Sequence, residues 1–228
     1  MNILGAIFPL GNFSHEKNSI SQHLQSALPF ARTCLIRGDA DQCFRSLLFQ
    51  AALSYAAIEK TVCYYTPTPF PTIPVLIHQL KPNSLSTANL HLIQFHYLST
   101  LADVQKHLMN SSSDIIIIDG YLEYPLLKNE DLFRITSACV LLRDMQNYRT
   151  KKFEKEDLIL LCSCTCTQSA TANIEHRALF DLGINVEMRD DGDYQAKLRT
   201  SIKKQMTCTL TFRMCRNEIL PLRATIEY

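Results

Sequence analysis

The stretch Asp114-Ile115-Ile116-Ile117-Ile118-Asp119-Gly120 constrains the fold of this chain more than any other. Its four isoleucines show no alternation of apolar and polar residues, so both faces of the strand need burial, as in a central parallel strand. Asp119 stands where the apolar run stops. In doubly wound α/β folds, ligands bind beyond the carboxyl ends of the strands, which is where a Walker B acid lies. A buried strand that ends in a plain Asp-Gly turn explains the same residues equally well.

The composition excludes several other classes of protein. The 228 residues carry a net charge of +1, so any basic surface must be local. The nine cysteines have no regular spacing, which argues against a secreted disulfide framework. The apolar residues 2–13 lack the basic region and cleavage site of a signal peptide, and no apolar run is long enough to span a membrane. We therefore expect a soluble protein of a reducing compartment, without a membrane partner.

The spacing of apolar residues predicts an α/β core at 31–228, preceded by a separate N-terminal arm at 1–30. Alternating strands and helices imply a mostly parallel sheet, which a C-terminal hairpin follows. Strands are expected at 33–36, 62–65, 92–97, 114–118, 158–164 and 184–188, with the hairpin at 207–213 and 218–226. Helices are expected at 19–28, 43–58, 100–109, 130–148 and near 174–181, and loops at 66–82 and 149–155.

A phosphate-binding loop is recognisable but broken. The working motif reads G-x-x-x-x-G-K-[ST] between a strand and a helix. Here that place reads Gly38-Asp39-Ala40-Asp41-Gln42-Cys43-Phe44-Arg45, so Gly38 alone survives. Phe44 replaces the lysine and Arg45 replaces the hydroxyl residue that holds magnesium. Arg45 lies about 100° further around the helix than the lysine position, which makes it a poor substitute. An ordinary Asp-rich turn before a helix describes these residues better than a phosphate site.

Three segments of the chain resemble a small family, the SWIM-domain-associated paralogues of RecA-type recombinases. They are residues 38–53, Ile93-Gln94-Phe95-His96-Tyr97 and residues 115–124, in the same order and at similar spacing. The resemblance implies a RecA-like P-loop NTPase-type core with a degenerate P-loop. Gly38 would match the first P-loop glycine, and Asp119 would match the Walker B acid. Because the lysine is missing, we expect Asp119 to be structural and to accept hydrogen bonds from the turn or from nearby hydroxyls.

The resemblance also implies a function. The protein would form a hetero-oligomer with a SWIM-type zinc protein in the nucleus. It would promote or stabilise filaments of a RecA-type recombinase on single-stranded DNA during homologous recombination repair. The degenerate loop predicts a non-catalytic or weakly catalytic protein with no cofactor. The alternative is a DNA-stimulated ATPase that uses ATP and Mg²⁺, with Asp119 and Glu123 as catalytic residues and Gly38, Arg45 and Asp119 contacting the nucleotide.

Two further groups of residues carry candidate chemistry. Arg149, Lys151, Lys152 and Lys155 could contact DNA phosphates, with a neighbouring aromatic ring for stacking. A solvated charged loop is an equally good interpretation, because Glu154, Glu156 and Asp157 dilute the positive charge of the cluster. The run Cys162-Ser163-Cys164-Thr165-Cys166 is not expected to bind a metal, because alternate residues of a strand do not converge on one ion.

The apolar N-terminal arm either docks on a partner, through Phe8, Phe13 or Phe30, or folds over its own sheet.

Overall fold

The computed structural model describes residues 3–8, 31–38, 41–72, 74, 76–77, 87–121, 124, 132–153, 158–165, 180–200, 207–214 and 218–227. Within this part, all strands belong to one ten-stranded sheet of order β3-β10-β9-β8-β7-β1-β6-β5-β2-β4. The strands are β1 Thr33–Gly38, β2 Val62–Thr66, β3 Leu76–Ile77, β4 Ile93–Tyr97, β5 Ile115–Ile118, β6 Ile159–Thr165, β7 Leu182–Met188, β8 Tyr194–Thr200, β9 Thr207–Met214 and β10 Glu218–Glu227. Six neighbouring strands, from β7 to β4 in this order, are parallel, and the rest form the antiparallel extension β8-β9-β10 with β3 at its edge.

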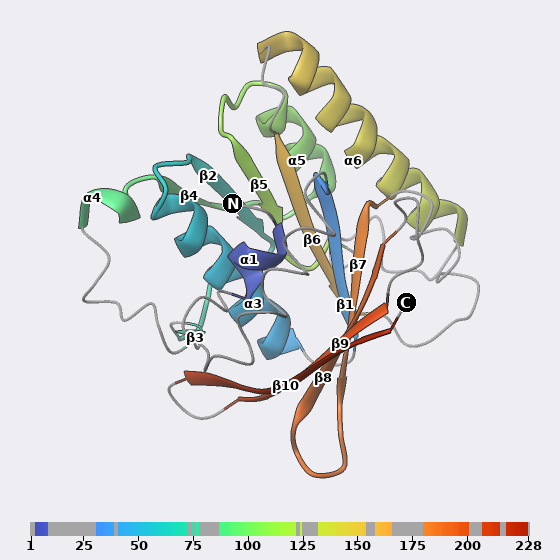
Figure 1. Cartoon of the computed structure of the whole chain (residues 1–228). Helices are drawn as coiled ribbons and strands as arrows, with labels where there is room; N and C mark the ends of the chain where they lie inside the picture. Colours follow the sequence, from blue (N-terminus) through green and yellow to red (C-terminus); the bar gives the residue numbers. More distant parts are fainter. Residues whose placement is uncertain are drawn as a thin grey trace.

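Helices cover both faces of the parallel part of the sheet (Figure 1). The helices are α1 Ile3–Ile7, α3 Asp41–Ala56, α4 Thr87–Leu90, α5 Leu101–Leu108 and α6 Leu132–Phe153. One apolar cluster joins α1 and α3 to the first face, and a second joins α5 and α6 to the other. None of the helices in the described part of the chain combines the length and apolar character that a membrane crossing requires.

The isoleucine run forms an internal strand of the parallel part of the sheet, as the sequence predicts. β5 lies between β2 and β6 and pairs with both in parallel. Ile115 and Ile117 belong to the cluster on the α3 face, whereas Ile116 and Ile118 belong to the cluster on the α5–α6 face. Because a strand sends successive side chains to opposite faces, a strand covered on both sides needs an uninterrupted apolar sequence.

The hairpin prediction is confirmed by the antiparallel pair β9–β10. The loop predicted at 66–82 contains the short strand β3, which pairs with β10, and two further points need correction. Residues 149–153 are helical and not a loop, because α6 continues to Phe153. No glycine or proline interrupts these residues, and Arg149 is buried against the body of the protein, which favours continuation of the helix. Strand β8 was not predicted; a turn at residues 190–192 joins it to β7. The helix predicted at 19–28 lies outside the described residues.

The beginning of the N-terminal arm is part of the core. Ile3, Ile7 and Phe8 are all buried, and the Phe8 ring lies 5.9 Å from that of Phe212 on β9, measured between centroids. Residues 3–8 therefore fold over the protein's own sheet, which is the second of the two alternatives for the arm. Phe13 and Phe30 lie outside the described residues.

Candidate functional site

The fold gathers the residues of the broken nucleotide motif at one edge of the sheet. The strands β1, β6, β5 and β2 are parallel neighbours, so their carboxyl ends meet at this edge. Gly38 is the last residue of β1, Thr66 is the last of β2, and Asp119 directly follows β5. Strand β6 separates β1 from β5 and adds Ser163 near its own carboxyl end. Gly38 and Asp119 therefore lie at the same edge of the sheet, with β6 between their strands.

Asp119 is buried, with both carboxylate oxygens occupied. Its exposed fraction is 3%. Ser163 Oγ donates to Oδ1 at 2.9 Å. Thr66 Oγ1 lies 3.3 Å from Oδ2 and shares its one hydrogen between this oxygen and the Thr68 carbonyl oxygen at 2.9 Å. Arg45 Nε lies 2.9 Å from the same Oδ2 and forms an ion pair with it. The expected hydrogen bonds from nearby hydroxyls are therefore present, and Arg45 supplies a positive charge that the sequence did not reveal as a partner.

Burial and the ion pair act on the Asp119 carboxyl in opposite directions. Loss of hydration raises its pKa above the ordinary value of 3.8, and this is the larger effect. The charge of Arg45 and the hydrogen bonds from Ser163 and Thr66 lower the pKa and so oppose that rise. The carboxylate depends on these three neighbours, because an unpaired charge at this depth would be costly.

The Arg45 side chain is held on three sides. Besides Asp119, its Nη2 donates to Thr68 Oγ1 at 2.8 Å, and its guanidinium carbon lies 5.8 Å from the centre of the Phe70 ring. Thr68 and Phe70 belong to the Pro-rich segment that follows β2. This segment therefore lies against the guanidinium, whose side chain is only 20% exposed. Arg45 takes part in the site as an internal cation.

The other two altered P-loop positions are apolar and buried. Phe44 is 2% exposed and Cys43 is fully buried, both within the α3-face cluster. Gly38 has φ +149°, and a Cβ atom there would lie 1.9 Å from the carbonyl oxygen of Val186 and 3.3 Å from Phe44 Cζ. Position 38 therefore requires a glycine, because β7 passes too close for any Cβ atom. Phe44 packs in the core at the position where the working motif has its lysine ammonium.

Other candidate residues of the sequence lie outside the described part of the chain or do not form a metal site. Glu123 and Lys155 lie outside the described residues, as does Asp39 of the broken loop. Among the residues that the structure describes, no group of three or more His, Cys, Asp or Glu side chains could hold a metal ion. Cys162 and Cys164 are buried on β6, which agrees with their interpretation as small apolar groups.

The candidate DNA contacts separate into buried and exposed residues. Arg149 is 1% exposed, and its Nη2 donates to the carbonyl oxygens of Ser111 and Ser113 at 2.7 and 3.0 Å. This burial, which also lowers the pKa of the guanidinium, argues against Arg149 as a DNA contact. Lys151 and Lys152 are exposed on α6. The sequence could not separate them, because it predicted a loop, in which residues have no fixed inner and outer side.

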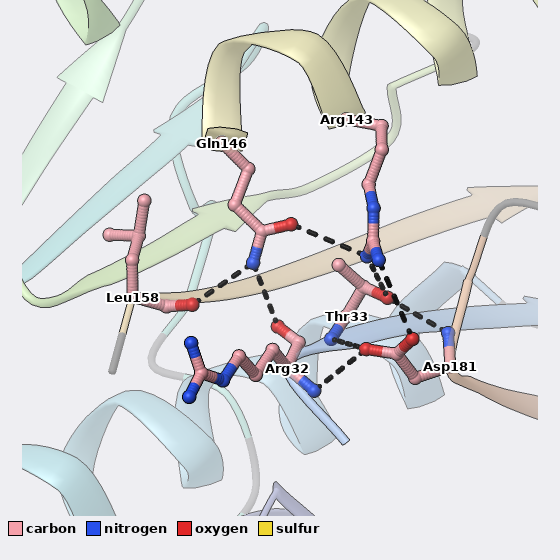
Figure 2. A network of polar contacts seen from close by, with 6 residues as sticks. All are labelled: Arg32, Thr33, Arg143, Gln146, Leu158 and Asp181. Carbon is pink, nitrogen blue, oxygen red and sulfur yellow. Dashed lines mark hydrogen bonds and ion pairs between the residues drawn. The ribbon is translucent and has the colours of Figure 1, made fainter. Parts of the chain in front are cut away.

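A polar network that the sequence did not indicate anchors α6 at the opposite edge of the sheet (Figure 2). Arg143 Nη1 donates to Thr33 Oγ1 at 3.0 Å, and Gln146 Nε2 donates to the carbonyl oxygen of Leu158 at 3.0 Å. Asp181 Oδ2 accepts from the backbone N–H groups of Arg32 and Thr33 at 2.8 and 3.0 Å. These contacts join α6 to the amino ends of β1, β6 and β7, so they fix the helix and leave the Asp119 edge untouched.

Comparison with known proteins places the fold. No family model matches the chain, and no curated protein matches it. A solved ATPase domain is similar over 93% of this chain and 99% of that chain, with a TM-score of 0.56 and 9% sequence identity. The flagellar accessory protein FlaH from Methanocaldococcus jannaschii has a TM-score of 0.48 and 15% identity over 86% of this chain and 89% of its own. The chain thus has a RecA-like α/β fold with a mostly parallel sheet.

Proposed function

We propose that this chain is a non-catalytic RecA-like recombinase paralogue. It acts with a SWIM-type zinc protein to promote or stabilise filaments of a RecA-type recombinase on single-stranded DNA in homologous recombination repair. The RecA-like fold supports the general class. The three resembling segments, at 38–53, 93–97 and 115–124, support the particular family. The nuclear location and the hetero-oligomer follow from that same family resemblance.

The ion pair between Arg45 and Asp119 is the observation that carries the non-catalytic part of the proposal. Phosphoryl transfer needs cations placed on the phosphates, normally a lysine and a magnesium ion. Here Phe44 occupies the lysine position in the core, and the carboxylate that would serve the magnesium is already neutralised by Arg45. A nucleotide would have to break this ion pair before it gained any charge stabilisation of its own.

The alternative, a weak DNA-stimulated ATPase, has one observation in its favour. Gly38 and Asp119 keep their places at the carboxyl edge, and Arg45, in contact with Asp119, is a cation that could turn toward a phosphate. This mechanism requires Arg45 to leave Asp119, Thr68 and Phe70 together, and it requires the released carboxylate to hold magnesium. The alternative therefore predicts that any nucleotide binding depends on both Asp119 and Mg²⁺.

Isothermal titration of the purified chain with a non-hydrolysable ATP analogue and Mg²⁺ separates the two functions. We expect no binding in the micromolar range. Micromolar binding that disappears in Asp119→Ala, with the variant still folded, would establish the ATPase alternative and overturn the non-catalytic proposal. Co-purification with the SWIM-type protein, followed by nucleotide analysis of the complex, tests the partner and extends the same question to the assembled state.

A further inference from the structure

Helix α6 carries an exposed apolar face. Val140, Leu141 and Tyr148 have exposed fractions of 40%, 38% and 45%, and they account for three of the eight large apolar side chains exposed in the described part of the chain. A fourth, Met109 at the end of α5, lies beside the last turn of α6, because Lys152 Nζ donates to its carbonyl oxygen at 2.8 Å. Figure 1 shows α6 as a long helix on the outside of the sheet.

This face is separate from the one that holds α6 to the protein. Leu142, Met145, Gln146 and Arg149 follow helical spacing and are all buried. Together with the network at the amino edge of the sheet, these residues hold the inner side of the helix. On the outer side, Lys152 adds a hydrogen bond to the Met109 carbonyl oxygen, whereas Val140 and Leu141 are exposed. The outer apolar residues therefore contribute little to the fold of the isolated chain, and their exposure needs another explanation.

The charges along the same face indicate what kind of molecule could cover it. Exposed Asp144 interrupts the apolar stripe, and exposed Lys151 and Lys152 end it, so the described part of this face carries one carboxylate and two ammonium groups. From Val140 to Lys152 the stripe runs about 18 Å along the helix. A complementary helix would present an apolar side toward Leu141 and Tyr148 and a carboxylate toward Lys151.

Other occupants fit this face less well. The segment 3–8 is already buried against α3 on the opposite face of the sheet, so this part of the arm is not available. Two copies of α6 would bring two net positive stripes together. Single-stranded DNA would gain from the lysines and from Tyr148, but Val140 and Leu141 offer nothing to phosphate, and the Lys152 ammonium is already bonded to the Met109 carbonyl.

We propose that the outer face of α6, defined by Val140, Leu141, Tyr148 and Lys151, docks an amphipathic helix of a protein partner whose acidic residues face the lysine end. The inference rests on the proposed function for the identity of that partner, the SWIM-type zinc protein. It moves the interface from the N-terminal arm to a helix whose inner side is fixed and whose outer side is apolar.

The experiment compares two matched substitutions in the full-length chain co-expressed with the SWIM-type protein. Leu141→Asp places a charge in the middle of the proposed interface. Ile58→Asp, at an apolar residue that is 44% exposed just after α3, is the control. We expect Leu141→Asp to reduce capture of the partner at least tenfold and Ile58→Asp to leave it unchanged, with the same thermal melting for both. If Leu141→Asp melts early, Lys151→Glu replaces it, with an expected fivefold reduction.

The outcomes distinguish failure of the proposed docking surface from failure of the proposed function with the SWIM-type protein. If the unaltered chain fails to capture the SWIM-type protein, the proposed function itself is overturned. If the unaltered chain and Leu141→Asp capture it equally, the function stands and the docking surface is overturned. Light scattering that shows a homodimer abolished by Leu141→Asp assigns the face to a second copy. Fluorescence anisotropy that shows weaker single-stranded DNA binding with unchanged capture assigns it to DNA. Either result overturns the inference.

Discussion

Replacement of Arg45 by methionine should destabilise the protein without affecting any binding to nucleotide. Methionine fills much of the same volume but removes the charge and the donors that reach Asp119 and Thr68. The Asp119 carboxylate, 3% exposed, would keep its two hydroxyl partners, Ser163 and Thr66, and lose the cation that is paired with it. The variant therefore measures what an uncompensated charge costs at this depth.

The size of the effect follows from the burial of the two side chains. Removal of one partner from a buried ion pair costs about 3–5 kcal/mol. Because the Arg45 side chain is 20% exposed, water can reach part of the gap, and we expect the lower end, about 3 kcal/mol. For a chain of this length that loss corresponds to a fall in melting temperature of about 6–12 °C. Arg143→Met is the comparison, because its ion pair with Asp181 is longer, 3.7 Å, and more exposed. It also loses the 3.0 Å hydrogen bond to Thr33 Oγ1, and it should cost about 1–2 kcal/mol in all.

The pH dependence gives a second, independent measure of the same interaction. Burial raises the pKa of Asp119 in the folded state above 3.8, so ionisation of this group opposes folding. Its contribution to stability is thus fully present below pH 3.8 and is lost as the pH rises through the folded pKa. Arg45 lowers that pKa, and its removal therefore raises it further. The stability difference between the unaltered chain and Arg45→Met should be small near the acid end of the range and grow toward neutral pH.

Urea unfolding followed by circular dichroism, repeated between about pH 4.5 and 7.5, measures both quantities. Asp119→Asn should cost less than Arg45→Met, about 1–2 kcal/mol, because it removes the buried charge together with the ion pair. A loss below about 1 kcal/mol for Arg45→Met at neutral pH, or a loss that does not change with pH, would refute the argument that Asp119 is a structural carboxylate balanced by Arg45.

Three further substitutions test other parts of the structure by urea unfolding. Gly38→Ala should cost about 3 kcal/mol or more, because φ is +149° and the new Cβ would meet the Val186 carbonyl; a neutral effect would mean that β7 is not so close. Phe8→Ala should cost about 3 kcal/mol through its lost packing on Phe212, and a loss under about 1 kcal/mol would return the segment to a separate arm. Arg149→Ala should cost about 3 kcal/mol and leave binding of single-stranded DNA unchanged, whereas a stable variant with weak DNA binding would restore it as a DNA contact.

The sequence predicts the parts of this fold in which one residue pattern has one structural meaning. Four isoleucines without alternation can satisfy a strand only where both faces are covered, and β5 lies there. The place of Asp119 at the carboxyl edge follows from the same run. The end of α6 was missed because the charged residues after Tyr148 look like a solvated loop. Burial of Arg149 against the carbonyls of Ser111 and Ser113 is a long-range contact that has no local signal.

The partner of Asp119 could not be predicted for a related reason. Arg45 is 74 positions away in the sequence, and the motif assigns its position to magnesium and not to a carboxylate. The contact between Arg45 and Asp119 depends on the direction of the Arg45 side chain from α3 and on the insertion of β6 between β1 and β5. It also depends on Thr68 and Phe70, two residues of the Pro-rich segment that contact the guanidinium. Periodicity and spacing describe none of these three.

The ion pair also gives a physical reason why an acid remains where the lysine is absent. In a working nucleotide site, the carboxylate and the lysine are balanced by magnesium and phosphate, which come from outside the protein. With Phe44 in the lysine position, a carboxylate as buried as Asp119 would have no such balance and would cost several kcal/mol. Arg45, at the position of the missing hydroxyl, supplies the cation from within the chain. The charge balance of this edge no longer requires a ligand, so we expect a protein partner, and not a nucleotide, to change what this domain does.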